Sequence, residues 1–136
     1  MNKFKILLKM QLVWLMLAIW FHVVSLVRIK LGMNSLSLNS PTGSIAFLSL
    51  FAGVIYLGWK SYYLLFFVFN TVLITVIFYK GLLFQLLDFA IGNDLTAYPS
   101  VMAWYIGMLI NLYGIPVSYT ACFLAFKKYK SAGSTL

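Results

Sequence analysis

The chain has 136 residues, of which 63% are hydrophobic and 9% are charged, whereas a soluble domain usually carries about 25% charged residues. Two acidic residues are too few to solvate a globular surface of this size. The composition therefore excludes a soluble enzyme, a disordered tail and a nucleic-acid-binding domain. The net charge of +8 comes from basic residues that lie between apolar runs, where they indicate the topology of a membrane protein.

The first apolar segment predicts a membrane helix over about residues 6–29. Lysines at positions 3, 5 and 9 precede it, as in a signal peptide, but no small-x-small cleavage site follows the apolar run. We therefore expect an uncleaved first helix. Residues 34–44 are rich in Asn, Ser, Pro and Gly and predict the first loop.

The second and third segments, about 42–59 and 62–79, are separated only by Lys60 and Ser61. A single helix over residues 45–79 would be about 52 Å long, well beyond a hydrocarbon core of about 30 Å. We therefore predict a tight helical hairpin. Aromatic residues around its turn support this prediction, because such rings collect at membrane interfaces.

Residues 82–91 form an apolar run that Gln85 and Asp88 interrupt. The run is too short to span a bilayer and predicts a short interfacial or re-entrant segment. The alternative is that the third helix continues as a tilted helix to about Leu87. Residues 92–100 predict a loop, and about 101–126 predict the fourth and longest helix.

These segments predict a single membrane domain over residues 1–136. Its fold class is an all-α integral membrane protein with four transmembrane helices in an up-down bundle. Both termini and Lys60 then share one side, which holds seven basic residues against three on the other. The positive-inside rule places both termini in the cytoplasm. The expected location is a plasma membrane, and a bacterial inner membrane is the preferred choice.

Three of the polar residues inside the predicted spans are candidates for function. Asn70 and Asn111 predict either hydrogen bonds that join helices or a polar lining for a substrate path. His22 is either a neutral histidine bonded to a neighbour or a group for proton or quinone handling. Asp88 is the carboxylate that could pair with His22 or Arg28 if its segment folds back.

Two rows of small residues recur every four positions in the fourth segment: Ala103, Gly107 and Asn111, then Gly114, Ser118 and Cys122. Such rows let another helix approach closely, within the bundle or in a partner. Pro116 lies between the rows and is expected to kink the helix, because it leaves a backbone carbonyl one turn earlier without its donor.

The sequence lacks the residues that several kinds of chemistry require. One cysteine and one histidine exclude an intrachain disulfide and bis-histidine haem ligation within one chain. These two residues and the two aspartates are too dispersed for a zinc site. No carboxylate lies in the middle of a span, which argues against transport coupled to a membrane-embedded acid. We therefore expect neither enzymatic activity nor a cofactor.

Three hypotheses for function remain. The first is a non-enzymatic subunit, accessory or immunity-type protein that acts through helix–helix contacts, with a homo-oligomer or another membrane protein as partner. The second is an oligomeric channel or small-solute carrier lined by His22, Asn70, Thr75 and Asn111. The third and weakest is a membrane enzyme or a lipid- or quinone-binding protein that uses His22 with Asp88. All three place the chain in a lipid bilayer and none involves nucleic acid.

Overall fold

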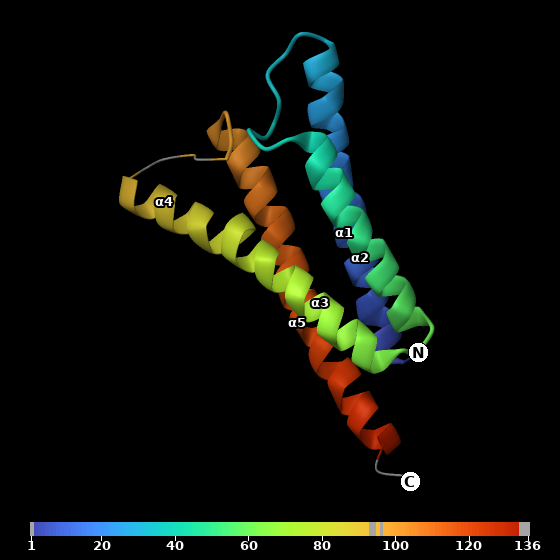
Figure 1. Cartoon of the computed structure of the whole chain (residues 1–136). Helices are drawn as coiled ribbons and strands as arrows, with labels where there is room; N and C mark the ends of the chain where they lie inside the picture. The colour runs from blue at the N-terminus through green and yellow to red at the C-terminus, as the bar shows by residue number, and fades with distance from the viewer. Residues whose placement is uncertain (1, 93–94, 96, 134–136) are drawn as a thin grey trace.

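The computed structural model describes residues 2–92, 95 and 97–133, and within them it contains helices and no strands. The helices are α1 (Lys3–Lys30), α2 (Pro41–Trp59), α3 (Tyr63–Ile77), the π-helical turn η1 (Phe78–Leu83), α4 (Phe84–Gly92) and α5 (Val101–Gly133) (Figure 1). Four helical runs are long and apolar enough to cross a membrane: α1, α2, the run from α3 to α4, and α5. This number agrees with the prediction.

Local hydrogen bonds explain where α1 ends and α2 begins. Gly32 has a φ of 74°, and this left-handed conformation reverses the chain after α1. The Ser25 hydroxyl accepts the Leu36 N–H at 3.2 Å, which ties the following loop back to α1. The Ser40 side chain then caps α2 by accepting the Gly43 N–H, and Pro41 occupies the first turn.

The predicted hairpin between the second and third segments is confirmed. α2 ends at Trp59, α3 begins at Tyr63, and Ser61 adopts a left-handed φ of 64° in the turn. The Tyr62 N–H donates to the Leu57 carbonyl at 3.0 Å and closes the end of α2. α2 then packs against both α1 and α3.

Residues 82–91 are not a separate re-entrant piece, so that part of the prediction is wrong and the alternative of a continued helix holds. An interfacial position of this segment stays a prediction. α3, η1 and α4 form one uninterrupted helical run that reaches Gly92, beyond Leu87. Gly81 does not end the helix, because the chain widens locally into the π-helical turn. The Asn111 Nδ2 atom of α5 donates to the Gly81 carbonyl at 2.8 Å and supports this turn.

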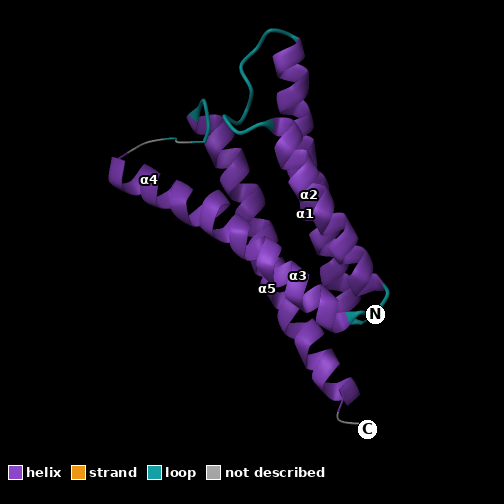
Figure 2. Cartoon of the chain, in the orientation of Figure 1, coloured by secondary structure: helices purple, strands orange, loops and turns teal. Residues whose placement is uncertain are grey.

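The four runs pack closely at the end that holds the N-terminus and the α2–α3 turn. α1 packs against α2 and α5, and α3 packs against α5. Phe4 and Phe66 meet edge to face at 5.3 Å between ring centroids. Towards the opposite end α4 runs away from the other helices (Figures 1 and 2). The bundle is therefore tight at one end and splayed at the other.

Candidate functional site

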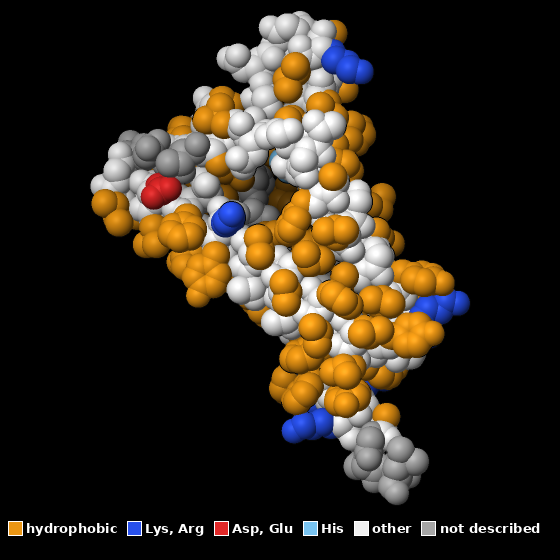
Figure 3. Space-filling model, viewed as in Figure 1, with side chains coloured by type: hydrophobic (Ala, Val, Ile, Leu, Met, Phe, Trp, Pro, Cys, Tyr) orange, Lys and Arg blue, Asp and Glu red, His pale blue; other side chains and the backbone are white. Residues whose placement is uncertain are grey.

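The splayed end contains a cavity of about 580 Å³ between α1 and α2 on one side and η1 and α5 on the other. This volume lies within the range of about 300–1,000 Å³ that is typical of small-molecule sites. Figure 3 shows the surface hollowed between α2 and the run from α3 to α4. The Leu38 N–H donates to the Ala97 carbonyl at 2.8 Å, so two loops meet across the far end of the bundle.

The lining changes from polar to apolar along the helices. Hydroxyl and amide side chains line the cavity near the loop end: Ser37, Asn39, Ser40 and Ser44. Further along the helices, towards the bundle centre, the lining is apolar: Trp14, Ala18, Phe47, Leu48 and Ile77. The cavity is therefore amphipathic, with its polar part near the loops.

Two polar residues that the sequence singled out meet at this cavity. His22 of α1 and Asn111 of α5 both line it. The Asn111 amide already donates to the Gly81 carbonyl, whereas His22 Nδ1 is buried and has no hydrogen-bond partner among the described residues. A ring nitrogen that is buried without a partner is the type of group that a bound molecule can satisfy. His22 is thus the main polar candidate of the site.

Tyr98 covers the cavity from the loop before α5, and its ring lies against Gly107. A Cβ atom at position 107 would lie 2.7 Å from the Tyr98 Cε1 atom, so a larger residue there would displace the ring. Burial raises the pKa of Tyr98 to about 12. The hydroxyl therefore stays protonated at neutral pH and remains a hydrogen-bond donor.

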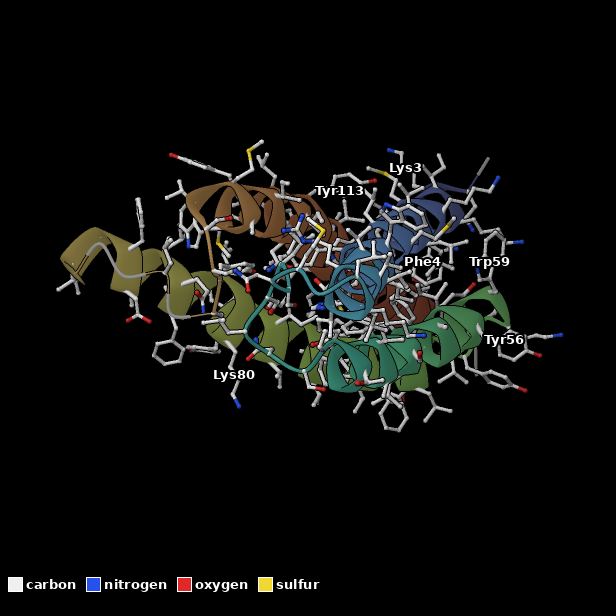
Figure 4. The ribbon with its side chains drawn as sticks, turned by 90° about the horizontal axis from the view of Figure 1, so that it is seen from above. Lys3, Phe4, Tyr56, Trp59, Lys80 and Tyr113 are labelled. Atoms are coloured by element: carbon white, nitrogen blue, oxygen red, sulfur yellow. The ribbon has the colours of Figure 1, made fainter. Side chains whose placement is uncertain are left out.

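The π-helical turn supplies Lys80 and Gly81 to the lining. Such turns inside α-helices occur frequently at functional sites. Figure 4 shows that the Lys80 side chain points outward from its helix. Among the described residues that line the cavity, none is an aspartate or glutamate. The side-chain charge around the cavity is therefore basic.

A second polar cluster lies in the closed part of the bundle. Gln11 Nε2 donates to Asn70 Oδ1 at 2.9 Å and to the Ser118 hydroxyl at 2.8 Å. Asn70 Nδ2 donates to the Ser118 carbonyl at 3.2 Å and to Cys122 Sγ at 3.0 Å. Gln11, Asn70 and Ser118 are fully buried, and Asn70 does not line the cavity. These contacts join α1, α3 and α5 in the manner of interhelical hydrogen bonds.

The small residues of α5 are covered by this chain itself. Gly107 faces the Tyr98 ring and Gly114 faces the Trp14 indole. Ser118 and Cys122 belong to the buried polar cluster. Pro116 lies between them, and α5 continues through it as one helix. The surface predicted for close helix approach is therefore occupied within the bundle.

Asp88 lies on α4 and does not line the cavity. The structure does not bring it to α1, where Arg28 Nε donates to the Asn34 carbonyl at 2.8 Å. The other acidic residue, Asp94, lies outside the described residues. Within the described part of the chain, no group of three His, Cys, Asp or Glu residues could hold a metal ion.

Gln11, a polar residue within the first apolar segment, was not singled out by the sequence analysis. Its position in the apolar run carried a signal, because a buried amide in lipid must find a polar partner. Comparisons of the chain with protein-family models, curated proteins and solved structures gave no match.

Proposed function

We propose that this chain is a non-enzymatic, multi-pass membrane protein that binds an amphipathic small molecule, of the lipid or quinone kind, in the cavity of its splayed end. The observation that carries the proposal is the amphipathic lining. Hydroxyl and amide groups lie near the loops, and apolar side chains lie towards the bundle centre. A molecule with a polar head and an apolar body matches this order of groups.

The positions of the loops and of the opening support this proposal. With both termini in the cytoplasm, the loop end faces the opposite membrane surface. The polar part of the cavity then lies beside the lipid headgroups, and its apolar part lies beside the acyl chains of the same leaflet. Because the loops meet across the far end, while the hollow lies at the side between α2 and the run from α3 to α4, we infer that the molecule enters sideways from the bilayer.

The contacts favour this function over a polar path lined by all four predicted side chains. Asn70 is held in the buried cluster, and Thr75 Oγ1 lies 3.1 Å from the Tyr119 hydroxyl. Only His22 and Asn111 of that set line the cavity. Action through helix contacts with a partner remains a prediction, but the small-residue rows on which it rested face this chain's own side chains.

Filling the cavity is expected to displace the bound molecule. Ala18 lines the cavity and is 8% exposed, so Ala18→Phe places a ring in the space that the molecule would occupy. Native mass spectrometry of the full chain, extracted in mild detergent, should detect a bound amphiphile on the wild type. The bound fraction of Ala18→Phe should fall to background.

The matched control is Ala46→Phe, because Ala46 is exposed on α2 and does not line the cavity. It should keep the bound molecule. Gly43→Leu is a second filling variant, since a Cβ atom there meets only Ser40, with Oγ at 3.6 Å. Equal occupancy in the wild type and both filling variants would contradict the proposal, as would a wild type that binds no amphiphile.

A further inference from the structure

We propose that the amphiphile in this cavity carries an anionic headgroup, which Lys80 binds at the mouth. The inference rests on the proposed function and adds the chemical class of the ligand. Lys80 belongs both to η1 and to the cavity lining. Lys80 therefore lies at the edge of the cavity, where the lining meets the exposed surface of the helical run.

The charge around the cavity selects the sign of the ligand. Among the described lining residues Lys80 is the one lysine or arginine, and none is an aspartate or glutamate. A cationic headgroup would meet repulsion from Lys80, and the described lining residues offer no carboxylate to offset it. An anionic headgroup would be attracted, and the low-dielectric surroundings of the mouth would strengthen this attraction relative to water.

The position of Lys80 fits a headgroup better than an acyl chain. Its side chain points outward from η1 (Figure 4) and is exposed. A lysine in this place can lay its methylene groups along the apolar helix surface and keep its ammonium group at headgroup level. The acyl chain of the same ligand would follow the apolar lining formed by Ala18 and Leu48.

The first N–H groups of α2 are largely satisfied within the chain. Pro41 has no N–H group, and the Gly43 N–H already donates to the Ser40 hydroxyl at 3.3 Å. The Ser44 N–H donates to the Ser40 carbonyl. In this proposal Lys80 supplies the main attraction for the negative charge, and hydrogen-bond donors such as the Tyr98 hydroxyl complete the polar part of the cavity.

In the test, the full chain in a neutral detergent is titrated with three ligands: phosphatidylglycerol, phosphatidylcholine and the free fatty acid. The acyl chains of both phospholipids are those of the same fatty acid. Native mass spectrometry reports the bound fraction. The variants are Lys80→Gln and the control Lys30→Gln, since Lys30 is an exposed lysine outside the cavity lining. Both substitutions are at exposed positions, and circular dichroism checks that both variants fold.

We expect tighter binding of an anionic ligand than of phosphatidylcholine. Lys80→Gln should weaken anionic binding about fivefold, as expected for loss of ~1 kcal/mol per basic residue near headgroups, and Lys30→Gln should not. Preference for phosphatidylglycerol identifies a phosphate ligand, and preference for the fatty acid identifies a carboxylate. Equal binding of all three ligands, unchanged in Lys80→Gln, would overturn this inference alone. No binding of any of the three ligands would also overturn the proposed function in its lipid-binding form.

Discussion

Gly114→Ala is expected to lower the free energy of unfolding by about 1–3 kcal/mol, the usual cost of overpacking a well-packed core. A Cβ atom at position 114 would overlap the Trp14 indole. That indole is fully buried and meets Phe51 edge to face at 5.1 Å between ring centroids. The added methyl group must therefore shift α1 against α5 or push the indole towards the cavity that it borders, and either change disturbs its contact with Phe51.

Titration with sodium dodecyl sulfate, followed by circular dichroism, measures this loss. Gly53→Ala is the matched control, because a Cβ atom at position 53 would have no atom of another helix within 4 Å. Its stability should stay equal or rise slightly, since alanine is a better helix former than glycine. Equal unfolding midpoints for the two variants would contradict the close contact between α1 and α5.

Asn70→Leu is the second large effect, with an expected loss of about 1–2 kcal/mol, at the upper end for a polar group inside a membrane bundle. The leucine removes the acceptor of Gln11 Nε2 and the donor to both the Ser118 carbonyl and Cys122 Sγ. It therefore removes three hydrogen bonds that join α3 to α1 and α5 in a place that water does not reach.

A double-mutant cycle distinguishes the loss of hydrogen bonds in this cluster from the effect of a changed side-chain volume. Gln11→Leu and Asn70→Leu share a hydrogen bond, so their combined loss of stability should be smaller than the sum of the single losses. Ser49→Ala is the control, because its hydroxyl is exposed and bonds only the Ile45 carbonyl of its own helix. Strictly additive losses for the pair at positions 11 and 70 would argue against the cluster.

Apolar length predicted most of the helices. The hairpin at Lys60 followed from the sequence because one helix over both apolar runs would be too long for a bilayer. The continuation of α3 through η1 into α4 did not follow, because a short apolar run has the same composition whether it is separate or joined. The contact that supports this continuation comes from Asn111, distant along the chain.

The candidate site was predictable only in part. His22 and Asn111 stood out as polar residues within apolar segments, but their meeting at one cavity depends on how the helices diverge. The gradient of the lining also arises from three-dimensional packing, because its polar part combines loop residues such as Ser37 with helix residues such as Ser44. The spacing of residues within one segment therefore does not predict which side chains line the cavity together. Lys80 was visible in the sequence only as a flanking charge.

The central claim is that an amphiphile occupies the cavity, and fluorescence quenching by lipids with brominated acyl chains tests it most directly. Single-tryptophan variants retain Trp14, Trp104 or Trp20, with the other tryptophans replaced by phenylalanine. Trp14 and Trp104 are both buried, at 0% and 5% exposure, but only Trp14 borders the cavity. Trp20 is 65% exposed and reports ordinary contact with lipid.

In vesicles of brominated lipid we predict strong quenching of Trp20, intermediate quenching of Trp14 and the least quenching of Trp104. Adding Ala18→Phe should reduce the quenching of Trp14 to the level of Trp104 and leave Trp20 unchanged. If Trp14 is quenched no more than Trp104 in the unfilled protein, lipid does not enter the cavity, and the proposed function is contradicted.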